Sequence, residues 1–518
     1  MLRRLYGAMS TSTDTITSAP GRKRAPTSSR RGRWIDHWDP EDEEFWESTG
    51  KRIAKKNLAL SMFAEHVGFS IWVIWTIVVI NLGNIGITLS VPELFWLTAV
   101  PNLVGSFLRI PYTFAIPRFG GRAWTTVSVA LLFVPTLLLA IVVPSGWLAG
   151  QSHTSQIWVL LLCAASAGLG GGNFSSSMAN ISFFYPERRK GFVLGLNAAG
   201  GNLGVASAQL FVPLVLIIGV PAAAVKLAKH PVHMSYAGLM WLPFLVIGVV
   251  GAWLFMDSLT QAKADTSSYV AALRYRQTWI MSLLYIGTFG SFIGFSFALP
   301  LVIKNTFPEF LIDHPFIATY LAGLGFMGAL IGSLSRPVGG WLSDKVGGAR
   351  VTLSVFLGMA VFTAVAIVGV RNRSFATFFA SYMAIFLLAG TGNGSTYKMI
   401  PTIFARIGRA EAEANGLDLK ATAVEFKRRA AAVIGIAGAI GAFGGFLIQV
   451  VLRQANLGVA GLVKAAKTPA EKVAVAAAHA DWSVPALVVF LGSYLVFATV
   501  TWFVFLRPSP ATHPSFGP

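Results

Sequence analysis

The stretch GSFLRIPYTFAIPRFGG (Gly105–Gly121) recurs in outline as GSLSRPVGGWLSDKVGG (Gly332–Gly348). Both copies begin with Gly-Ser-x-x-Arg and end on a Gly-Gly pair, and both lie in surroundings that are otherwise apolar. A weak internal repeat of this kind is typical of membrane proteins that are built from two related halves. We therefore predict two halves, with Arg109 and Arg336 at equivalent places.

The composition indicates the class of protein. Hydrophobic residues make up 54% of the 518-residue chain and charged residues 12%, and the mean hydropathy is +0.63. Soluble domains usually carry about 25% charged residues, whereas a helix that crosses a bilayer needs about 20 apolar ones. Apolar runs of this length lie at 60–80, 91–117, 123–144, 156–184, 191–219, 236–256, 278–303, 316–343, 350–370, 376–401, 431–452 and 483–506. The predicted fold is an all-α polytopic membrane protein with twelve transmembrane helices in two pseudo-symmetric six-helix halves.

The remaining segments complete the predicted organisation. The domains are a partly disordered basic tail with a surface helix at Asp39–Asn57 (1–56), a first half (57–256), a polar linker (257–277), a second half (278–506) and a short tail (507–518). No apolar core follows Arg3 and Arg4, so we expect no signal peptide. The single Cys163 allows no disulfide framework within the chain.

The charge is strongly basic, with 41 Lys and Arg against 22 Asp and Glu and a net charge of +19. Most of the basic residues fall in the N-terminal tail and in alternate loops between the predicted helices. Such an alternation follows the positive-inside rule. It predicts a multi-pass protein of the plasma (inner) membrane with both termini in the cytoplasm, and it argues against nucleic acid as a partner.

Three cations fall inside the predicted spans: Arg109, Arg336 and Lys398. A cation at the bilayer centre costs at least about 2.5–3.5 kcal/mol, which makes it a candidate for function. Snorkelling does not explain the arginines, because their distance from the loop glycines places them near the midplane. A structural ion pair with Glu65 of the first span remains an alternative, although one carboxylate cannot neutralise three cations.

Two arginines that face one cavity repel each other unless an anion lies between them. Each guanidinium offers two parallel N–H donors, which match a planar oxyanion. The sequence therefore predicts that Arg109 and Arg336 bind a small anion.

Two glycine-rich helices accompany the arginines, GFVLGLNAAGGNLG from Gly191 and GIAGAIGAFGG from Gly435. Glycines at spacings of three and four let helix backbones approach closely, which suits halves that rock against each other. Ordinary small-residue packing without motion is the alternative. The glycines concerned are Gly191, Gly195, Gly200, Gly201, Gly204, Gly435, Gly438, Gly441, Gly444 and Gly445.

Polar residues within apolar spans must face partners or water, because unpaired polar groups are costly in hydrocarbon. They cluster in GLGGGNFSSSMANISFFYP (168–186) and GTGNGSTYKMIP (390–401). Asn197 and Asn202 on the first glycine-rich helix are candidate donors to an oxyanion. Tyr285 and Phe289 are four residues apart and share a helix face, for which packing alone is the simpler reading.

Several of these stretches resemble a known family. GGWLSDKVGGAR (339–350) resembles the loop signature of the major facilitator superfamily, whose Asp, here Asp344, helps to gate the cytoplasmic side; the first-half copy, AIPRFGGR (115–122), lacks it. The stretches FAEHVGFSIWVIW, NFSSSMANISFFYP, YIGTFGSFIGFS and GTGNGST, together with both glycine signatures, are similar to the nitrate/nitrite porters of that superfamily. The resemblance covers about residues 39–506.

This resemblance implies a site and an activity. Nitrate would lie between Arg109 and Arg336 and between the rings of Phe174 and Phe289. An Asn of the first signature and a Tyr of the seventh helix would complete the site; these are Asn202, or less closely Asn197, and Tyr285. The implied function is nitrate and nitrite transport by alternating access, as a functional monomer without cofactor.

The coupling mode is predicted from charge. A closed cavity that held both arginines, with Lys398 nearby, would be strongly positive without an anion, which favours nitrate/nitrite exchange over an unloaded return. A nitrate/proton symporter is the alternative, with Glu65, His66 and Lys398 as the titratable candidates. A passive small-anion channel and a transport-inactive sensor are further alternatives. No motif of a metal site or an enzyme is found in the sequence.

Overall fold

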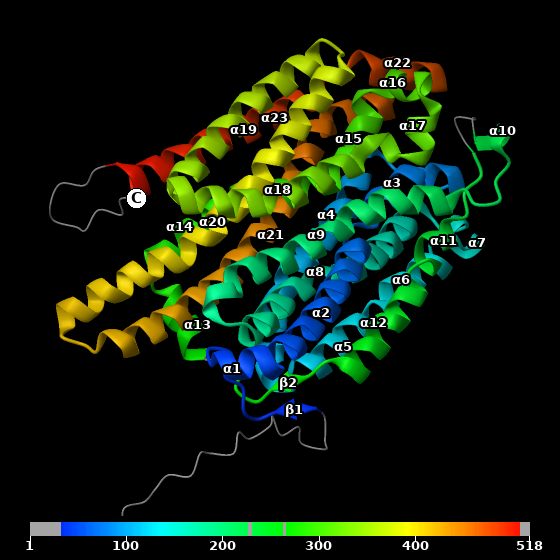
Figure 1. Cartoon of the computed structure of the whole chain (residues 1–518). Helices are drawn as coiled ribbons and strands as arrows, with labels where there is room; N and C mark the ends of the chain where they lie inside the picture. Colours follow the sequence, from blue (N-terminus) through cyan, green and yellow to red (C-terminus); the bar gives the residue numbers. More distant parts are fainter. Residues whose placement is uncertain (1–32, 226–229, 263–265, 508–518) are drawn as a thin grey trace, which may run out of the picture.

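The computed structural model describes residues 33–225, 230–262 and 266–507, and it is a bundle of long helices (Figure 1). The first half contains α2 (Lys51–Val73), α3 (Trp75–Asn81), α4 (Val91–Phe119), α5 (Gly121–Leu131), α6 (Phe133–Ile141), α8 (His153–Phe184), α9 (Glu187–Leu216), α11 (Met234–Leu239) and α12 (Leu242–Phe255). The second half contains α14 (Arg276–Tyr285), the π-helical η3 (Ile286–Gly290), α15 (Ser291–Thr306), α18 (Gly325–Val346), α19 (Gly348–Arg371), α20 (Phe375–Asn415), α21 (Leu419–Ala465), α23 (Val484–Thr501) and η5 (Trp502–Leu506).

Shorter elements connect these helices. They are β1 (Trp34–Ile35), α1 (Glu43–Phe45), η1 (Trp46–Gly50), η2 (Leu82–Ile85), α7 (Gly146–Ala149), α10 (Ala222–Val225), β2 (Ser258–Leu259), α13 (Thr266–Leu273), α16 (Pro308–Asp313), α17 (Pro315–Tyr320), η4 (Ala322–Leu324) and α22 (Pro469–Ala478).

The predicted all-α membrane fold is confirmed. Within the described ranges, 11 helical segments are long and apolar enough to cross a membrane. The remaining predicted crossing corresponds to α18, which is 22 residues long but carries Arg336 and three serines. α18 therefore differs from the other spans in polarity and not in length. One of its polar residues, Arg336, lies buried inside the bundle.

The predicted start of the eighth span, at 316, is wrong. α18 begins only at Gly325, after the short helices α16 and α17, which both open with proline. Gly323 and Leu324 adopt left-handed backbone angles, with φ of 67° and 68°, and these angles end any continuous helix. The apolar run was therefore read as one helix across a real break.

The intervals 402–430 and 453–482, which lie between the predicted spans, are largely helical and not loops. α20 continues to Asn415, and α21 runs unbroken from Leu419 to Ala465, so the two form a hairpin that projects from one end of the bundle (Figure 1). Gly416 makes the turn with φ of 61°, and the Asp418 side chain accepts a hydrogen bond from the Ala421 N–H at 2.9 Å. Charged residues with high helix propensity continue these helices beyond the apolar segment.

The predicted surface helix at Asp39–Asn57 is not a separate element. The helix starts at Glu43, capped by Asp42, and runs through η1 into α2. Upstream of it, β1 pairs in parallel with β2 of the linker. The tail expected to be disordered falls almost entirely outside the described residues.

The two halves meet along two long pairs of helices. α4 packs along α21, and α9 packs along α18. Each pair contains one helix with a predicted site arginine and one with a glycine signature: Arg109 and Arg336 lie on α4 and α18. The fold therefore brings both repeat motifs to the boundary between the halves.

Candidate functional site: two buried arginines between the halves

Arg109 of α4 is fully buried and bonded to backbone carbonyls of both halves. Its Nε donates to Gly171 O at 3.1 Å, and its Nη1 donates to Gly438 O at 2.8 Å across the boundary. Its Nη2 has no hydrogen-bond partner among the described residues. The arginine is thus held in place while one donor group stays available.

Arg336 of α18 is buried in a similar way, with 3% of its surface exposed. Its Nη2 donates to the Tyr285 hydroxyl at 3.2 Å. Its Nη1 finds no hydrogen-bond partner in the described part of the chain. Each of the two guanidinium groups therefore offers one unpaired nitrogen inside the bundle.

Phe174 and Phe289 form the aromatic surface on which the arginines converge. The rings are near parallel, with centroids 6.0 Å apart and an interplanar angle of 24°. The Arg109 guanidinium carbon lies 4.7 Å from the Phe174 centroid and 4.9 Å from that of Phe289, and the Arg336 carbon lies 5.7 Å from Phe174. Tyr285 stacks on Phe289 at 5.4 Å. The two cations therefore share one ring, Phe174, as a neighbour.

Asn202 of α9 and Tyr397 of α20 carry further buried polar groups without partners. Both amide atoms of Asn202 are unpaired among the described residues, as is the Tyr397 hydroxyl. Tyr397 lies near both Arg336 and Tyr285: the Arg336 guanidinium carbon is 5.5 Å from its ring, and the two tyrosine centroids are 6.4 Å apart. Buried polar atoms are normally satisfied, so the unpaired nitrogens of Arg109 and Arg336 and the unpaired Tyr397 hydroxyl leave donors at this cluster for which the described residues provide no acceptor.

Asn197 is engaged differently from Asn202. Its Nδ2 donates to Glu65 Oε2 at 3.0 Å and contacts the Ser177 hydroxyl at 2.7 Å, and Ser177 donates to the same Glu65 oxygen at 2.6 Å. Glu65 is fully buried and interacts electrostatically with Arg109 and Arg336. Of the two asparagines predicted from sequence, Asn197 uses its Nδ2 in these bonds, whereas neither amide atom of Asn202 has a partner among the described residues.

Lys398 does not lie with the arginines, so its predicted place near the cavity is wrong. It forms an ion pair with Asp344 of α18, and the two side chains are 47% and 56% exposed. The apolar residues around Lys398 in sequence belong to a helix that continues beyond the apolar segment. The Lys398–Asp344 pair does join two of the residues predicted as gating or coupling candidates.

His66, a further coupling candidate next to Glu65, is bonded through Nδ1 to Gly200 O at 3.0 Å.

The signature glycines divide into tight and open positions. A Cβ on Gly204 would lie 2.1 Å from His66 O, and one on Gly441 would lie 2.5 Å from Tyr285 Cδ1. Gly200, Gly201 and Gly445 are also tight, with nearest atoms at 2.6, 2.5 and 2.7 Å. Gly444 is less tight, with its nearest atoms at 3.0 Å, and Gly435 and Gly438 have ordinary contacts. Gly191 and Gly195 face open space, with no atom within 4 Å of an added Cβ. Close helix packing thus explains the tight glycines of both signatures, but it does not explain Gly191 and Gly195.

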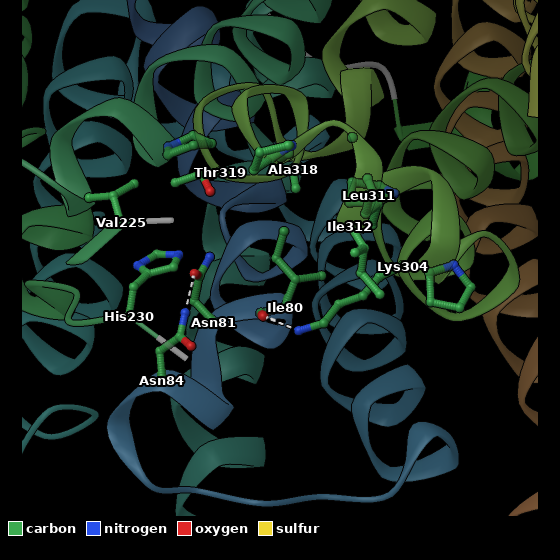
Figure 2. Close-up of a pocket in the computed structure, with 16 residues that line it drawn as sticks. Ile80, Asn81, Asn84, Val225, His230, Lys304, Leu311, Ile312, Ala318 and Thr319 are labelled. Carbon is green, nitrogen blue, oxygen red and sulfur yellow. Dashed lines mark hydrogen bonds between the residues drawn. The ribbon is translucent and has the colours of Figure 1, made fainter. Parts of the chain in front are cut away.

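A separate cavity of about 360 Å³ (Figure 2) is lined mainly by residues of α3, α15, α16 and α17. These elements lie toward the end of the bundle opposite β1 and β2 (Figure 1). The cavity is bordered by Asn81, Asn84, His230, Lys304 and Thr319, among others. Lys304 donates to the Ile80 carbonyl and so ties α15 to α3 across the two halves. The cavity does not include the arginine cluster.

Some residues of the arginine cluster were not singled out from sequence. Trp72 of α2 lies 5.5 Å from the Arg109 guanidinium carbon, and Tyr397 adjoins Arg336. Tyr397 immediately precedes Lys398 in a polar stretch that was recognised, so its hydroxyl was a detectable signal. The carbonyls of Gly171 and Gly438 carry no side-chain signal of their own.

Comparison with known proteins places this architecture in a family. Residues 58–449 match the model of the Major Facilitator Superfamily. Over 488 residues the chain is 37% identical to the "Nitrate/nitrite transporter NarU" of Salmonella typhimurium. The match covers 92% of this chain and 97% of the relative. The chain belongs to the nitrate/nitrite porter family of this superfamily. The predicted family is therefore confirmed.

Other members of this porter family and more distant structures agree with the assignment. The "Probable nitrate/nitrite antiporter NarK2" of Thermus thermophilus is 35% identical over 81% of this chain and 89% of its own. A bacterial homologue of the human lysosomal transporter Spinster, in an inward-facing and unoccupied conformation, has a TM-score of 0.60 at 15% identity, and the match covers 88% of this chain and 97% of that one. At this identity the structural likeness supports the fold alone.

Proposed function

We propose that this chain carries nitrate and nitrite across the membrane by alternating access, with the anion held between Arg109 and Arg336. The supporting observation is that each guanidinium, buried and fixed by other bonds, keeps one nitrogen unpaired beside the shared ring of Phe174. A buried donor that lacks a partner costs about 1–3 kcal/mol. An anion that accepts from both arginines recovers this cost.

The neighbours of the arginines favour a flat, weakly hydrated monoanion. Phe174 and Phe289 are near parallel and present ring surfaces to the site, and Asn202 and Tyr397 add neutral donors. A dianion such as sulfate needs a larger shell of polar groups and is more costly to desolvate. Relatives at 35–37% identity are named as nitrate/nitrite transporters or antiporters.

Exchange of nitrate for nitrite is our proposal for the coupling mode. The pair of buried arginines makes closure without an anion unfavourable, since arginine cannot lose its proton to relieve the charge. Two relatives from Thermus thermophilus carry the word antiporter in their names. Lys398 no longer contributes to this argument, because it is paired with Asp344 away from the arginines.

The membrane topology and the gate complete the proposal. Both termini would lie in the cytoplasm of a cell whose plasma membrane holds the protein as a functional monomer. The exposed Lys398–Asp344 pair would then lie on the cytoplasmic side, where Asp344 helps to gate access.

Counterflow into proteoliposomes tests the function. Labelled nitrate outside should accumulate transiently when the vesicles contain unlabelled nitrate or nitrite, and Arg336→Lys should abolish this accumulation. Nitrate uptake that does not saturate as the external nitrate concentration rises, and that does not depend on an internal anion, would instead indicate a passive channel.

A nitrate/proton symporter is the second candidate, because the buried Glu65 lies within electrostatic reach of both arginines. Uptake into vesicles without any internal anion, driven by an inward proton gradient, separates this mode from exchange.

A further inference from the structure

We infer that Glu65 binds a proton together with the transported anion, so that anion binding and proton binding at this site strengthen each other. The inference rests on the proposed function and assigns a titratable group to the same site. It concerns equilibrium binding and does not depend on which coupling mode dominates in transport.

The geometry of Glu65 provides the first argument. The carboxyl group is completely buried, and Ser177 and Asn197 donate to one oxygen only, Oε2, at 2.6 and 3.0 Å. The other oxygen, Oε1, has no hydrogen-bond partner among the described residues. Gly201 leaves room for it, since a Cβ at that position would lie 2.5 Å from Oε1. One oxygen is thus fixed as an acceptor while the second is free to carry a proton.

The charged groups that face Glu65 come from both halves. Arg109 of α4 and Arg336 of α18 act on it, and the Tyr397 phenol of α20 lies within its field. On its own helix, His66 turns to the Gly200 carbonyl. The other helices packed on α2 keep their charged residues at their ends: α5 has Arg122, α8 has His153, α9 has 187–190, and α12 has none.

Charge balance links the anion to the proton. When Glu65 is ionised, two arginines face one carboxylate. A monoanion that enters is then attracted by the arginines and repelled by the carboxylate of Glu65. Protonation of Glu65 removes the like charge from a buried site where electrostatic interactions are strong. The anion in turn raises the free energy of ionised Glu65 and favours its protonation. Linkage requires that the two effects be equal.

A chain of hydroxyl groups leads away from Glu65 within the same helices. The Ser177 hydroxyl, which donates to Glu65, also lies 2.9 Å from the hydroxyl of Ser61, one turn earlier on α2. Ser61 lies on the side of Glu65 nearer β1 and β2. A proton taken from water would form the O–H bond at Glu65 when the anion binds, and that bond would break again, with return of the proton to water, when the anion leaves.

Calorimetry on the purified full-length protein tests the inference. Nitrate is titrated at a series of pH values, in buffers with different ionisation enthalpies, so that the number of protons taken up per nitrate is measured directly. We expect uptake of up to one proton, and an affinity that falls by as much as about tenfold per pH unit where Glu65 titrates.

Matched variants assign the proton. Glu65→Gln keeps an oxygen acceptor for Ser177 and Asn197; it should bind nitrate with an affinity near that of the wild type at low pH and take up no proton. Glu65→Asp, which keeps a carboxyl group, should retain the pH dependence. His66→Gln and the exposed Glu309→Gln should also retain it, and thermal unfolding verifies that each variant is folded.

The opposite results are equally clear. Proton uptake that persists in Glu65→Gln, or nitrate binding to the wild type without proton uptake at any pH, would overturn the inference and leave nitrate transport intact. Failure of the wild type to bind nitrate at every pH would instead refute the proposed function itself.

Discussion

Glu65 and Tyr285 occupy equivalent positions in the two halves. A Cβ added to Gly201 of the first glycine signature would meet Glu65, and one added to the corresponding Gly441 of the second would meet Tyr285, at 2.5 Å in both cases. Tyr285 contacts Arg336 directly, at 3.2 Å. The pseudo-symmetry thus places a carboxyl group in the first half where the second half has a phenol, beside the arginine cluster.

Replacement of either buried arginine by lysine should abolish most nitrate binding. Lysine supplies a point charge but not two parallel N–H donors, and the loss of one charge-assisted hydrogen bond is worth about 1.5–3 kcal/mol. We expect Arg109→Lys and Arg336→Lys to weaken nitrate affinity by at least about tenfold. The exposed Arg350→Lys is the matched control. Wild-type affinity in Arg336→Lys would exclude it from the site.

The two asparagines of α9 should behave in opposite ways. Asn202→Ala removes an amide that has no protein partner, so nitrate affinity should fall while the melting temperature stays the same or rises. Asn197→Ala breaks the bonds to Glu65 and Ser177, so the melting temperature should fall. Parallel titration and thermal unfolding of the two variants decide the matter, and equal loss of stability would contradict the assignment.

Glycines of one signature should differ in their tolerance to alanine. Gly204→Ala places a methyl group 2.1 Å from the His66 carbonyl oxygen, and overpacking of this kind costs about 1–3 kcal/mol. We expect a lower melting temperature and lost transport. Gly195→Ala, on the same helix but facing open space, should be close to neutral. If both variants transport normally, close packing of α2 on α9 is not required.

The Lys398–Asp344 pair should affect transport more than stability. Both side chains are about half exposed, and exposed ion pairs contribute only about 0–1 kcal/mol to stability. Asp344→Asn should slow counterflow with little change in melting temperature. The exchanged pair, Asp344→Lys with Lys398→Asp, should recover part of the rate. A double variant no faster than Asp344→Asn would show that the pairing itself is not what matters.

The fold was predictable because helix length and apolarity in a membrane are set by local sequence. The errors lie where apolarity and helix structure diverge. The apolar run before α18 hides the left-handed residues Gly323 and Leu324, and the polar residues after Pro401 continue a helix beyond the apolar segment. Hydropathy indicates whether a segment lies in lipid or in water. It does not indicate where the helical backbone begins, breaks or ends.

The place of Arg109 and Arg336 inside the bundle was predictable, because charged side chains are unusual in a membrane span. The structure shows relations that spacing does not contain. Examples are the bond from Arg109 to the Gly438 carbonyl and the engagement of Asn197 with Glu65. Lys398 was misplaced because the sequence does not show that α20 continues to Asn415, nor that Asp344 of α18 lies within reach of the lysine.

The pairing of β1 with β2 has a mechanical consequence. Trp34 lies over Gly120, where a Cβ would meet its ring at 2.7 Å, and β2 lies beside it, so both segments are fastened to the first half. α13, only a few residues further along, packs on α21 of the second half. A binding partner or fusion domain attached before Trp34 would therefore be coupled rigidly to the first half. The second half would remain able to move relative to it.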